Sequence, residues 1–329
     1  MPRISRPTKS KQQAKIILLT ITILLAIYAI ITFTDIKDIA RNIFYQAPAE
    51  VSELTNKLPF TDKAKTIFYA TRPALESRDD FNQHCDSHDV DISVLGCYTD
   101  GKIYLYNVNS AELPNVVEST ATHELLHAAW ERLNFFEKST IEAELEKIYQ
   151  SHKELLSGDL ELYALEDRMD ELHSRVGTEI ANLPASLEHH YAKYFTDQDA
   201  VVALYNNYHE PFKKLKDEID ALSKELEAAK TNIDTRTKDY YQKSEALNQR
   251  IDEFNNCANT TGCFSSDSEF YSRRNELVTE RSALEEAYNS INDAIMRYNK
   301  KVTQHNNNIL RSETLENMIN SNAPVEEIN

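Results

Sequence analysis

The chain has 329 residues, enough for one or two domains with buried cores. It contains only five Gly and nine Pro, which disfavours a turn-dense all-β fold and favours helices. The formal net charge of −17 argues against nucleic acid, or an anionic lipid surface, as the main partner of the large C-terminal part.

The N-terminus combines a basic segment with a long uncharged run. Residues 1–15 carry Lys and Arg but no acid, and residues 16–34 contain no charge at all. Nineteen helical residues span about 28 Å, close to the hydrocarbon thickness of a bilayer. We therefore predict a single-pass cell-membrane protein with a cytoplasmic tail (1–15), a transmembrane helix (16–34) and an extracytoplasmic remainder. A cleaved signal peptide is the alternative, but the run is long for one and no small-x-small cleavage site follows it.

The four cysteines form two close pairs in sequence. Cys85 and Cys97 are twelve residues apart, and Cys257 and Cys263 are six apart. In an exported region such pairs predict two local disulfides. Neither pair has the C-x-x-C spacing that is typical of a structural zinc module.

Residues 35–204 are predicted to form one domain that is mainly helical with a small β-sheet. Thr61 or Asp62 is a suitable N-cap for a helix that follows it. The runs Asp91–Tyr98 and Lys102–Val108 are rich in β-branched and aromatic residues and flank the turn sequence Thr-Asp-Gly. This pattern predicts a β-hairpin, whose edge could hold an extended peptide by strand addition.

Apolar residues at helical spacing predict further helices in the same domain. They are expected over residues 113–133, 139–149, 159–176 and 184–195. Gly177 is predicted to end the third of them.

Residues 205–310 show a seven-residue repeat of apolar side chains on both sides of a polar break at 255–263. The first leg has Leu215, Ile219, Leu222 and Leu226, which step by four and three residues. This pattern predicts a long antiparallel coiled-coil hairpin, a possible binding surface for a protein partner. Residues 311–329 are predicted to form a C-terminal tail.

The stretch with the clearest chemistry is Thr122-His123-Glu124-Leu125-Leu126-His127. On a helix, His123 and His127 lie on one face and can present two imidazole nitrogens to one metal ion. Glu124 is then placed to reach a water molecule held by that ion. The H-E-x-x-H spacing thus predicts two zinc ligands and a general base. Zinc used for catalysis needs a third protein ligand from another segment.

This segment resembles the active helix of zincin metallopeptidases, and the resemblance covers roughly residues 85–195. A third ligand from a downstream helix would make the chain similar to the gluzincin branch, because no third His follows His127 at the metzincin spacing. Glu171 begins an E-x-x-small sequence, 44 residues past His127, and is the expected third ligand. Glu179 is the runner-up, followed by His173 and Glu166.

The resemblance also implies a stabiliser for the oxyanion of the reaction. The His and Tyr residues of the predicted helix 184–195 are candidates: His190 and Tyr191 first, with His189 and Tyr194. Two loop histidines, His84 and His88, are further candidate ligands, although histidines beside Asp residues in a loop are usually solvated surface.

The expected function is that of a membrane-anchored, extracytoplasmic zinc metallopeptidase that hydrolyses peptide bonds of a protein or peptide substrate. In this mechanism Glu124 acts as the general base on a zinc-bound water. The alternative is a non-enzymatic cell-envelope scaffold or regulator that acts through its coiled-coil hairpin.

Overall fold

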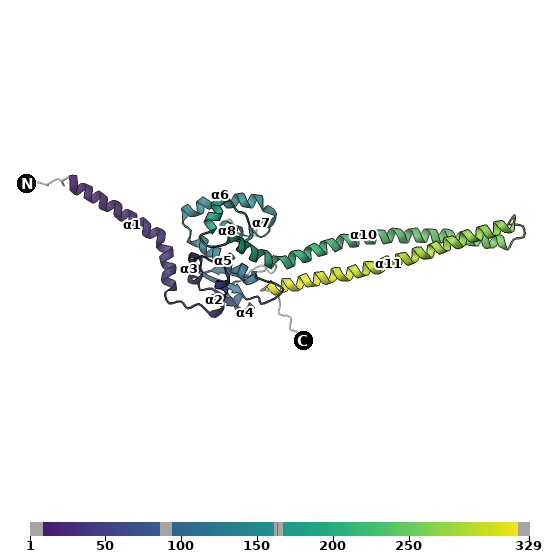
Figure 1. Ribbon diagram of the computed structural model, residues 1–329, viewed down its shortest axis with the longest axis horizontal. Helices are drawn as coiled ribbons and strands as arrows, with labels where there is room; N and C mark the ends of the chain where they lie inside the picture. Colours follow the sequence, from purple (N-terminus) through teal and green to yellow (C-terminus); the bar gives the residue numbers. More distant parts are fainter. Residues whose placement is uncertain (1–8, 86–93, 161–162, 164–166, 322–329) are drawn as a thin grey trace, which may run out of the picture. The chain divides into compact units, whose positions relative to one another are not determined.

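The computed structural model describes residues 9–85, 94–160, 163 and 167–321 (Figure 1). The chain divides into two compact units. The first contains the residues up to Pro211 together with those from Glu316 onward, and the second is Phe212–Leu315.

The first unit begins with three helices: α1 (Lys9–Asn42), α2 (Ala49–Lys57) and α3 (Asp62–Ala70). Thr61 is the N-cap of α3, as predicted, because its hydroxyl accepts a hydrogen bond from the Ala64 amide at 3.1 Å. No helix in the described part of the chain has the length and apolar character that crossing a membrane requires. The side chains of residues 23–33, in the predicted transmembrane helix, lie outside the described part.

The sheet has three strands, β1 (Ala74–Glu76), β2 (Gly96–Thr99) and β3 (Lys102–Tyr106), in the order β1-β3-β2. Strands β2 and β3 form the predicted antiparallel hairpin. Asp100 and Gly101 have φ values of 51° and 70°, which a two-residue hairpin turn requires and which Gly adopts without strain. The parallel strand β1 was not predicted. Predicted strand residues 91–93 lie outside the described part.

Further helices complete the first unit. They are α4 (Arg78–Phe81), α5 (Val116–Arg132), α6 (Phe135–Ser151), α7 (Lys153–Leu160), α8 (Arg168–Glu179) and α9 (Ala185–Tyr191). Among them, α4 and α5 pack on the sheet. Helix α6 begins earlier than the predicted residue 139, because Asn134 and Glu137 form a reciprocal capping box. The predicted helix over 159–176 is wrong in its bounds, since α7 ends at Leu160 and α8 begins at Arg168.

Gly177 lies inside α8 and does not end it, which corrects the sequence prediction. A Cβ atom at this position would lie 2.5 Å from Leu126 Cδ1 of α5 and 2.5 Å from Tyr191 Cε1 of α9. Glycine is therefore needed here because it lets α8 approach both helices closely.

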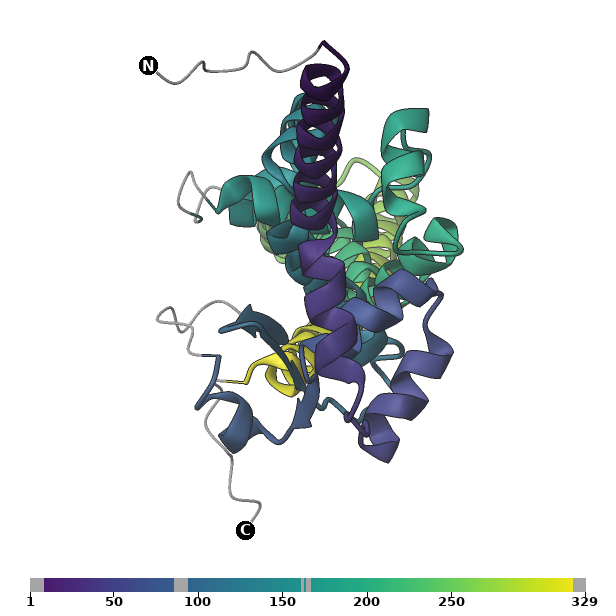
Figure 2. The same ribbon diagram turned by 90° about the vertical axis from the view of Figure 1, so that its left-hand side faces the viewer.

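The core of the first unit lies between α5, α8 and the sheet. Leu125 of α5, Leu172 of α8, and Ile103 and Leu105 of β3 are all completely buried. Each such side chain contributes about 1.5–3 kcal/mol to stability by leaving water. The end of α11 also belongs to this unit and lies beside the strands in Figure 2. Just past this helix, the Ser321 carbonyl accepts a hydrogen bond of 2.7 Å from the Asn82 side chain.

The second unit is built from α10 (Gln198–Ala258) and α11 (Asp267–Ile319). Glu225 of α10 pairs with Lys301 of α11 at 2.7 Å, and Arg250, further along α10, pairs with Glu280, which comes earlier in α11, at 2.6 Å. The two helices are thus antiparallel, with Leu222, Leu247, Leu277 and Ile291 buried along the seam. Helix α11 continues to Ile319, beyond the predicted hairpin end at 310.

Both predicted disulfides are present. Cys85 and Cys97 are bonded with Cα atoms 5.9 Å apart, and Cys257 and Cys263 with Cα atoms 5.4 Å apart. The first bond joins the segment after α4 to strand β2, and the second lies where α10 ends.

Candidate metal centre

Helix α5 brings the two histidines of the sequence motif together. The segment has no Gly or Pro, and its apolar side chains, such as Leu125 and Ala128, are fully buried, so the helix is fixed by packing. His123 and His127 lie one turn apart, with their Nε2 atoms 3.1 Å from each other. Both imidazoles are half-buried and line one cavity.

Helix α8 supplies the third group. The Glu171 Oε2 atom lies 3.3 Å from His127 Nε2 and 3.6 Å from His123 Nε2. Glu171 is only 6 % exposed, so its carboxylate has been removed from water and faces the two imidazoles. His123, His127 and Glu171 therefore form a triad close enough to bind a metal ion.

The spacing within this triad fits a tetrahedral ion. Ligands at about 2.0–2.1 Å from a tetrahedral zinc are about 3.3–3.4 Å from one another. The three ligand-to-ligand distances here are 3.1, 3.3 and 3.6 Å. Two imidazoles and one carboxylate are also a donor set that zinc uses in catalytic sites, and three protein ligands leave a fourth position open. The residues present thus fit a zinc ion.

Asp170 fixes the orientation of His127. Its Oδ1 atom accepts a hydrogen bond from His127 Nδ1 at 2.8 Å, so Nε2 is the ring nitrogen that can offer a lone pair to a metal ion in the triad. A carboxylate behind a metal-binding imidazole holds the ring in place and raises its basicity. Sequence reasoning missed Asp170, since only the fold shows that it faces α5.

Charges within the triad stabilise one another. Burial lowers the pKa of His123 and His127, but the Glu171 carboxylate, and for His127 also Asp170, outweighs burial and raises both pKa values. Burial raises the pKa of Glu171, but the two imidazoles outweigh it and lower this pKa. A metal cation that bound here would displace protons from the imidazoles.

Glu124 faces the same cavity from α5 and is 5 % exposed. Burial raises the pKa of its carboxyl group, against the opposing effect of the two imidazoles. Strand β2 passes directly over it, because a Cβ atom on Gly96 would lie 2.9 Å from Glu124 Oε1 and 2.5 Å from Thr120 Cγ2. Glycine at this position therefore allows the edge strand to approach the carboxylate.

The cavity has a volume of about 490 Å³ and is lined by α5, α8, β2 and the start of α10. From α10 come Tyr205, Tyr208 and His209, which sequence reasoning missed. The His209 ring lies between the two tyrosines, with ring centroids 4.1 and 4.3 Å away. Burial, with a smaller contribution from Arg175, lowers the pKa of His209 to about 4. The only sign of these three residues in the sequence is their i, i+3, i+4 spacing, which is also typical of a helix face that packs in a core.

The runner-up ligand, Glu179, also lines the cavity but is paired with another residue. Its Oε1 atom lies 2.9 Å from Arg175 Nε, and both side chains are buried. Glu166 and His88 lie outside the described part of the chain. His84 is hydrogen-bonded to Glu76 at 3.0 Å and does not line the cavity.

The predicted oxyanion stabilisers do not line the cavity, which argues against that role. His190 is buried with its Nε2 atom 2.9 Å from Nε2 of His173, and the Tyr191 hydroxyl donates to the His173 carbonyl at 2.8 Å. Tyr194 is likewise buried, whereas His189 is exposed. Periodicity placed these residues on a helix but could not show that its polar face points into the core.

No protein-family model matches the chain, and no curated protein or solved structure is significantly similar to it. The case for a metal site therefore depends on the positions of the three side chains and on Asp170 behind them.

Proposed function

We propose that the protein is a zinc-dependent metallopeptidase of the zincin type, close to the gluzincin branch. The observation that carries the proposal is the convergence of His123, His127 and Glu171 at the spacing of one tetrahedral ion. Glu124 lines the same cavity one residue after the first histidine, as a general base must.

The residues of the site divide into ligands and a proton carrier. His123, His127 and Glu171 would hold the zinc ion, with Asp170 orienting His127. When bound, zinc lowers the pKa of a coordinated water towards 7 and polarises a carbonyl group. Glu124 would accept the proton from the attacking water and later donate it to the leaving amine. Burial raises its pKa, which suits a group that accepts a proton and then donates it.

Strand β2 supports a peptide as the substrate. It is an edge strand, because it pairs only with β3 in the described sheet, and residues 94–98 line the cavity. An extended peptide can add to such an edge through main-chain hydrogen bonds. The close approach of Gly96 to Glu124 would bring a bond of that peptide to the general base.

We also propose that residues 16–34 anchor the protein in the cell membrane, with residues 1–15 in the cytoplasm. The uncharged run and the basic segment before it support this placement. Helix α1 continues without a break past Thr34 to Asn42, so the anchor would lead directly into the first unit. The two disulfides are compatible with the oxidising side of the membrane.

The test uses the full chain in detergent, with zinc content and cleavage of fluorescein-labelled casein as readouts. We expect zinc to bind in equimolar amount and a chelator to abolish cleavage. Glu124→Gln should keep zinc and lose cleavage, whereas Glu118→Gln, on the first turn of the same helix, should retain both. A Glu124→Gln protein with wild-type turnover would contradict the mechanism.

A scaffold that acts through the hairpin is the competing function. A groove of about 430 Å³ in the second unit favours it. Apolar side chains, among them Tyr240, Leu247 and Leu284, line it together with the charged residues Arg236, Asp239, Lys243, Arg250 and Glu280. A folded, metal-free protein that cleaves nothing even after zinc is added would support the scaffold and refute the peptidase.

A further inference from the structure

The first turn of α6 presents two neighbouring aromatic rings to solvent. The Phe135 and Phe136 side chains are 76 % and 79 % exposed, and their ring centroids lie 5.8 Å apart. Among the described residues, only Phe44 is a more exposed large apolar side chain. Single exposed apolar residues are common on soluble proteins, whereas a contiguous aromatic pair marks a candidate contact surface.

The capping box of α6 holds this aromatic pair in place. Asn134 Oδ1 accepts hydrogen bonds from the Phe136 and Glu137 amides at 2.9 and 3.1 Å. Glu137 Oε2 accepts in return from the Asn134 amide at 3.2 Å. The first turn of α6 is therefore fixed with both rings on the surface.

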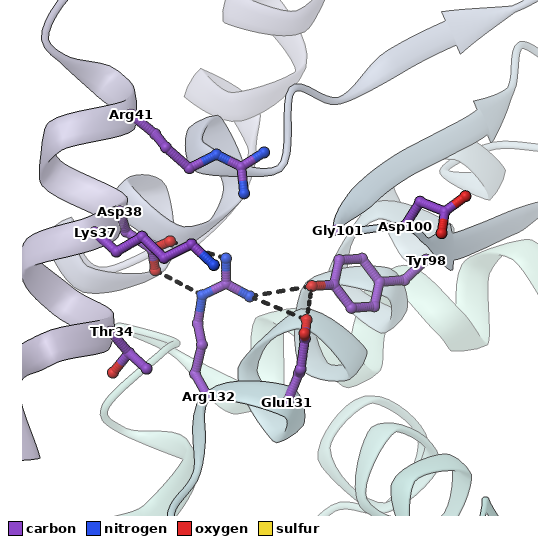
Figure 3. A pocket seen from close by; sticks show the side chains of 9 residues that line it. All are labelled: Thr34, Lys37, Asp38, Arg41, Tyr98, Asp100, Gly101, Glu131 and Arg132. Atoms are coloured by element: carbon purple, nitrogen blue, oxygen red, sulfur yellow. Dashed lines mark hydrogen bonds and ion pairs between the residues drawn. The ribbon is translucent and has the colours of Figure 1, made fainter. Parts of the chain in front are cut away.

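A contact just before the aromatic pair joins this part of the chain to α1. Arg132 Nε and Nη2 donate to the two Asp38 carboxylate oxygens at 2.6 and 2.9 Å (Figure 3). Asp38 is 2 % exposed, so this ion pair is part of the packed structure. Phe135 follows Arg132 by three residues, which span at most about 11 Å, so the aromatic pair lies near α1.

A contact just after the aromatic pair leads to α1 by a second route. The Lys193 Nζ atom lies 3.4 Å from Glu137 Oε1, and the Lys193 carbonyl accepts a hydrogen bond of 2.7 Å from the Thr61 hydroxyl. Thr61 is the N-cap of α3, and Lys63 in the first turn of α3 lies 3.7 Å from Asp35 of α1. The start of α6 is thus linked to α1 from both sides of the aromatic pair.

The acids beside the aromatic pair are matched by cations. Glu137 pairs with Lys193, and Asp35 pairs with Lys63. Burial raises the pKa of the Tyr194 hydroxyl, and the carboxylates of Glu137 and Asp35 raise it further, so both acids lie near this one hydroxyl. With these charges paired, no net negative charge from them would repel a lipid surface.

The two contacts with α1 place the aromatic pair at one end of the proposed anchor. Asp35 and Asp38 lie one and four residues past Thr34, about 1.5 and 6 Å further along the helix axis. The contact before the pair reaches the outer of these two positions, and the contact after it leads to the inner one. A headgroup layer is about 5–8 Å thick. In a chain anchored through residues 16–34, the start of α6 therefore lies at the level of the lipid headgroups.

We propose that Phe135 and Phe136 insert into the interfacial layer of the bilayer and give the first unit a second membrane contact. Aromatic side chains on the apolar face of a surface helix lie at the boundary between headgroups and acyl chains. This contact requires the proposed anchor in residues 16–34, because the anchor brings the aromatic pair to that depth.

The test measures the depth of a nitroxide label by electron paramagnetic resonance, with the full chain in phosphatidylcholine nanodiscs. All four native cysteines form disulfides, so an introduced cysteine is a unique labelling site. A label on Phe136→Cys should collide readily with oxygen, which concentrates in lipid, and rarely with a water-soluble nickel chelate.

Phe44→Cys is the matched control, because it also replaces an exposed phenylalanine. Phe44 lies two residues past the end of α1, which is itself about 12 Å beyond Thr34, so a label there should remain in water. We expect the nickel chelate to collide about tenfold less often with the label on Phe136→Cys than with the label on Phe44→Cys.

The neighbouring ring gives a second readout. With the label on Phe136→Cys, the added substitution Phe135→Ser removes the remaining phenyl ring and should increase collisions with the nickel chelate severalfold. Phe44→Ser, added instead, should leave them unchanged. Thermal unfolding of each variant shows whether it is folded, which we expect because these rings are exposed.

Three results would overturn the proposal. The first is equal collision of the nickel chelate with the labels on Phe136→Cys and Phe44→Cys. The second is shielding of the label on Phe136→Cys from oxygen as well as nickel, which indicates cover by protein. The third is shielding that occurs only in discs with two chains, which indicates contact with a second copy. Shielding from nickel alone, in discs that hold one chain, supports the bilayer.

A label on Leu19→Cys, within the uncharged run, tests the anchor separately. If this label lies in lipid while the label on Phe136→Cys lies in water, the anchor stands and the second contact is refuted. If the label on Leu19→Cys lies in water, the anchor is refuted and the second contact with it. Neither result depends on zinc or on Glu124, so this proposal and the peptidase proposal can fail separately.

Discussion

Asp170 provides the sharpest test of the metal centre, because it touches only one of the three candidate ligands. Its carboxylate accepts the 2.8 Å hydrogen bond from His127 Nδ1. A hydrogen bond of this kind to a charged group is worth about 1.5–3 kcal/mol. Loss of such a partner behind a metal ligand typically lowers metal affinity by about 10–100-fold, which corresponds to a similar free energy.

Two substitutions at this position should differ in size. Asp170→Asn keeps an oxygen that can accept from Nδ1 but removes the negative charge, so zinc affinity should fall by about tenfold. Asp170→Ala also removes the acceptor, and affinity should fall by nearly 100-fold. Asp167→Asn is the matched control, because Asp167 precedes the same helix and its side chain makes no capping hydrogen bond.

Zinc affinity is measured by competition with a chromophoric chelator, using the full chain in detergent at one pH. Circular dichroism of each variant establishes that α8 is still formed. Zinc affinity that is equal in wild type, Asp170→Asn and Asp170→Ala would refute the inference that His127 Nε2 faces a metal.

Further predictions concern the third ligand, the helix contact and the acid side of stability. Glu171→Gln should abolish stoichiometric zinc binding in metal analysis, whereas Glu179→Gln should retain it. If Glu171→Gln retains zinc, Glu171 is not the third ligand. Gly177→Ala should lower the free energy of unfolding in urea by about 1–3 kcal/mol through overpacking, and an unchanged midpoint would contradict the packing argument. The pKa of His190 is lowered to about 4 by burial, so its folded form resists protonation. The contribution of His190 to the free energy of unfolding is therefore complete above about pH 6.5. Urea unfolding should show that this free energy falls by about 3 kcal/mol as the pH is lowered to about 4, and that it falls less steeply in His190→Gln.

Features set by short stretches of sequence were predictable. The Thr61 cap, the Asp100-Gly101 turn and the one-turn spacing of His123 and His127 each depend on residues within one or two turns of the chain. The disulfides followed from short separations between cysteines. In each case the local geometry leaves few alternatives.

Features set by contacts between distant segments were not predictable. Strand β1 has three residues and exists through its pairing with β3, and a run this short has no periodicity to detect. The sequence predicts a helix end at Gly177, because it does not show that Leu126 and Tyr191 pack against this residue. The cavity residue His209 belongs to a helix whose heptads indicate only packing, so only the folded structure shows that it lies near the candidate metal centre.

In the proposed membrane-anchored protein, the ion pair between Asp38 and Arg132 would set the height of the candidate active site above the bilayer. Arg132 ends the helix that carries His123 and His127, and Asp38 lies four residues past Thr34, about 6 Å along α1. In a chain anchored through residues 16–34, no flexible tether separates the membrane from the metal-binding helix. Such an enzyme cannot sweep a large volume in search of substrate. It would select proteins by the height of a cleavable segment above the bilayer, so the proposed anchor would set a distance as well as attach the protein.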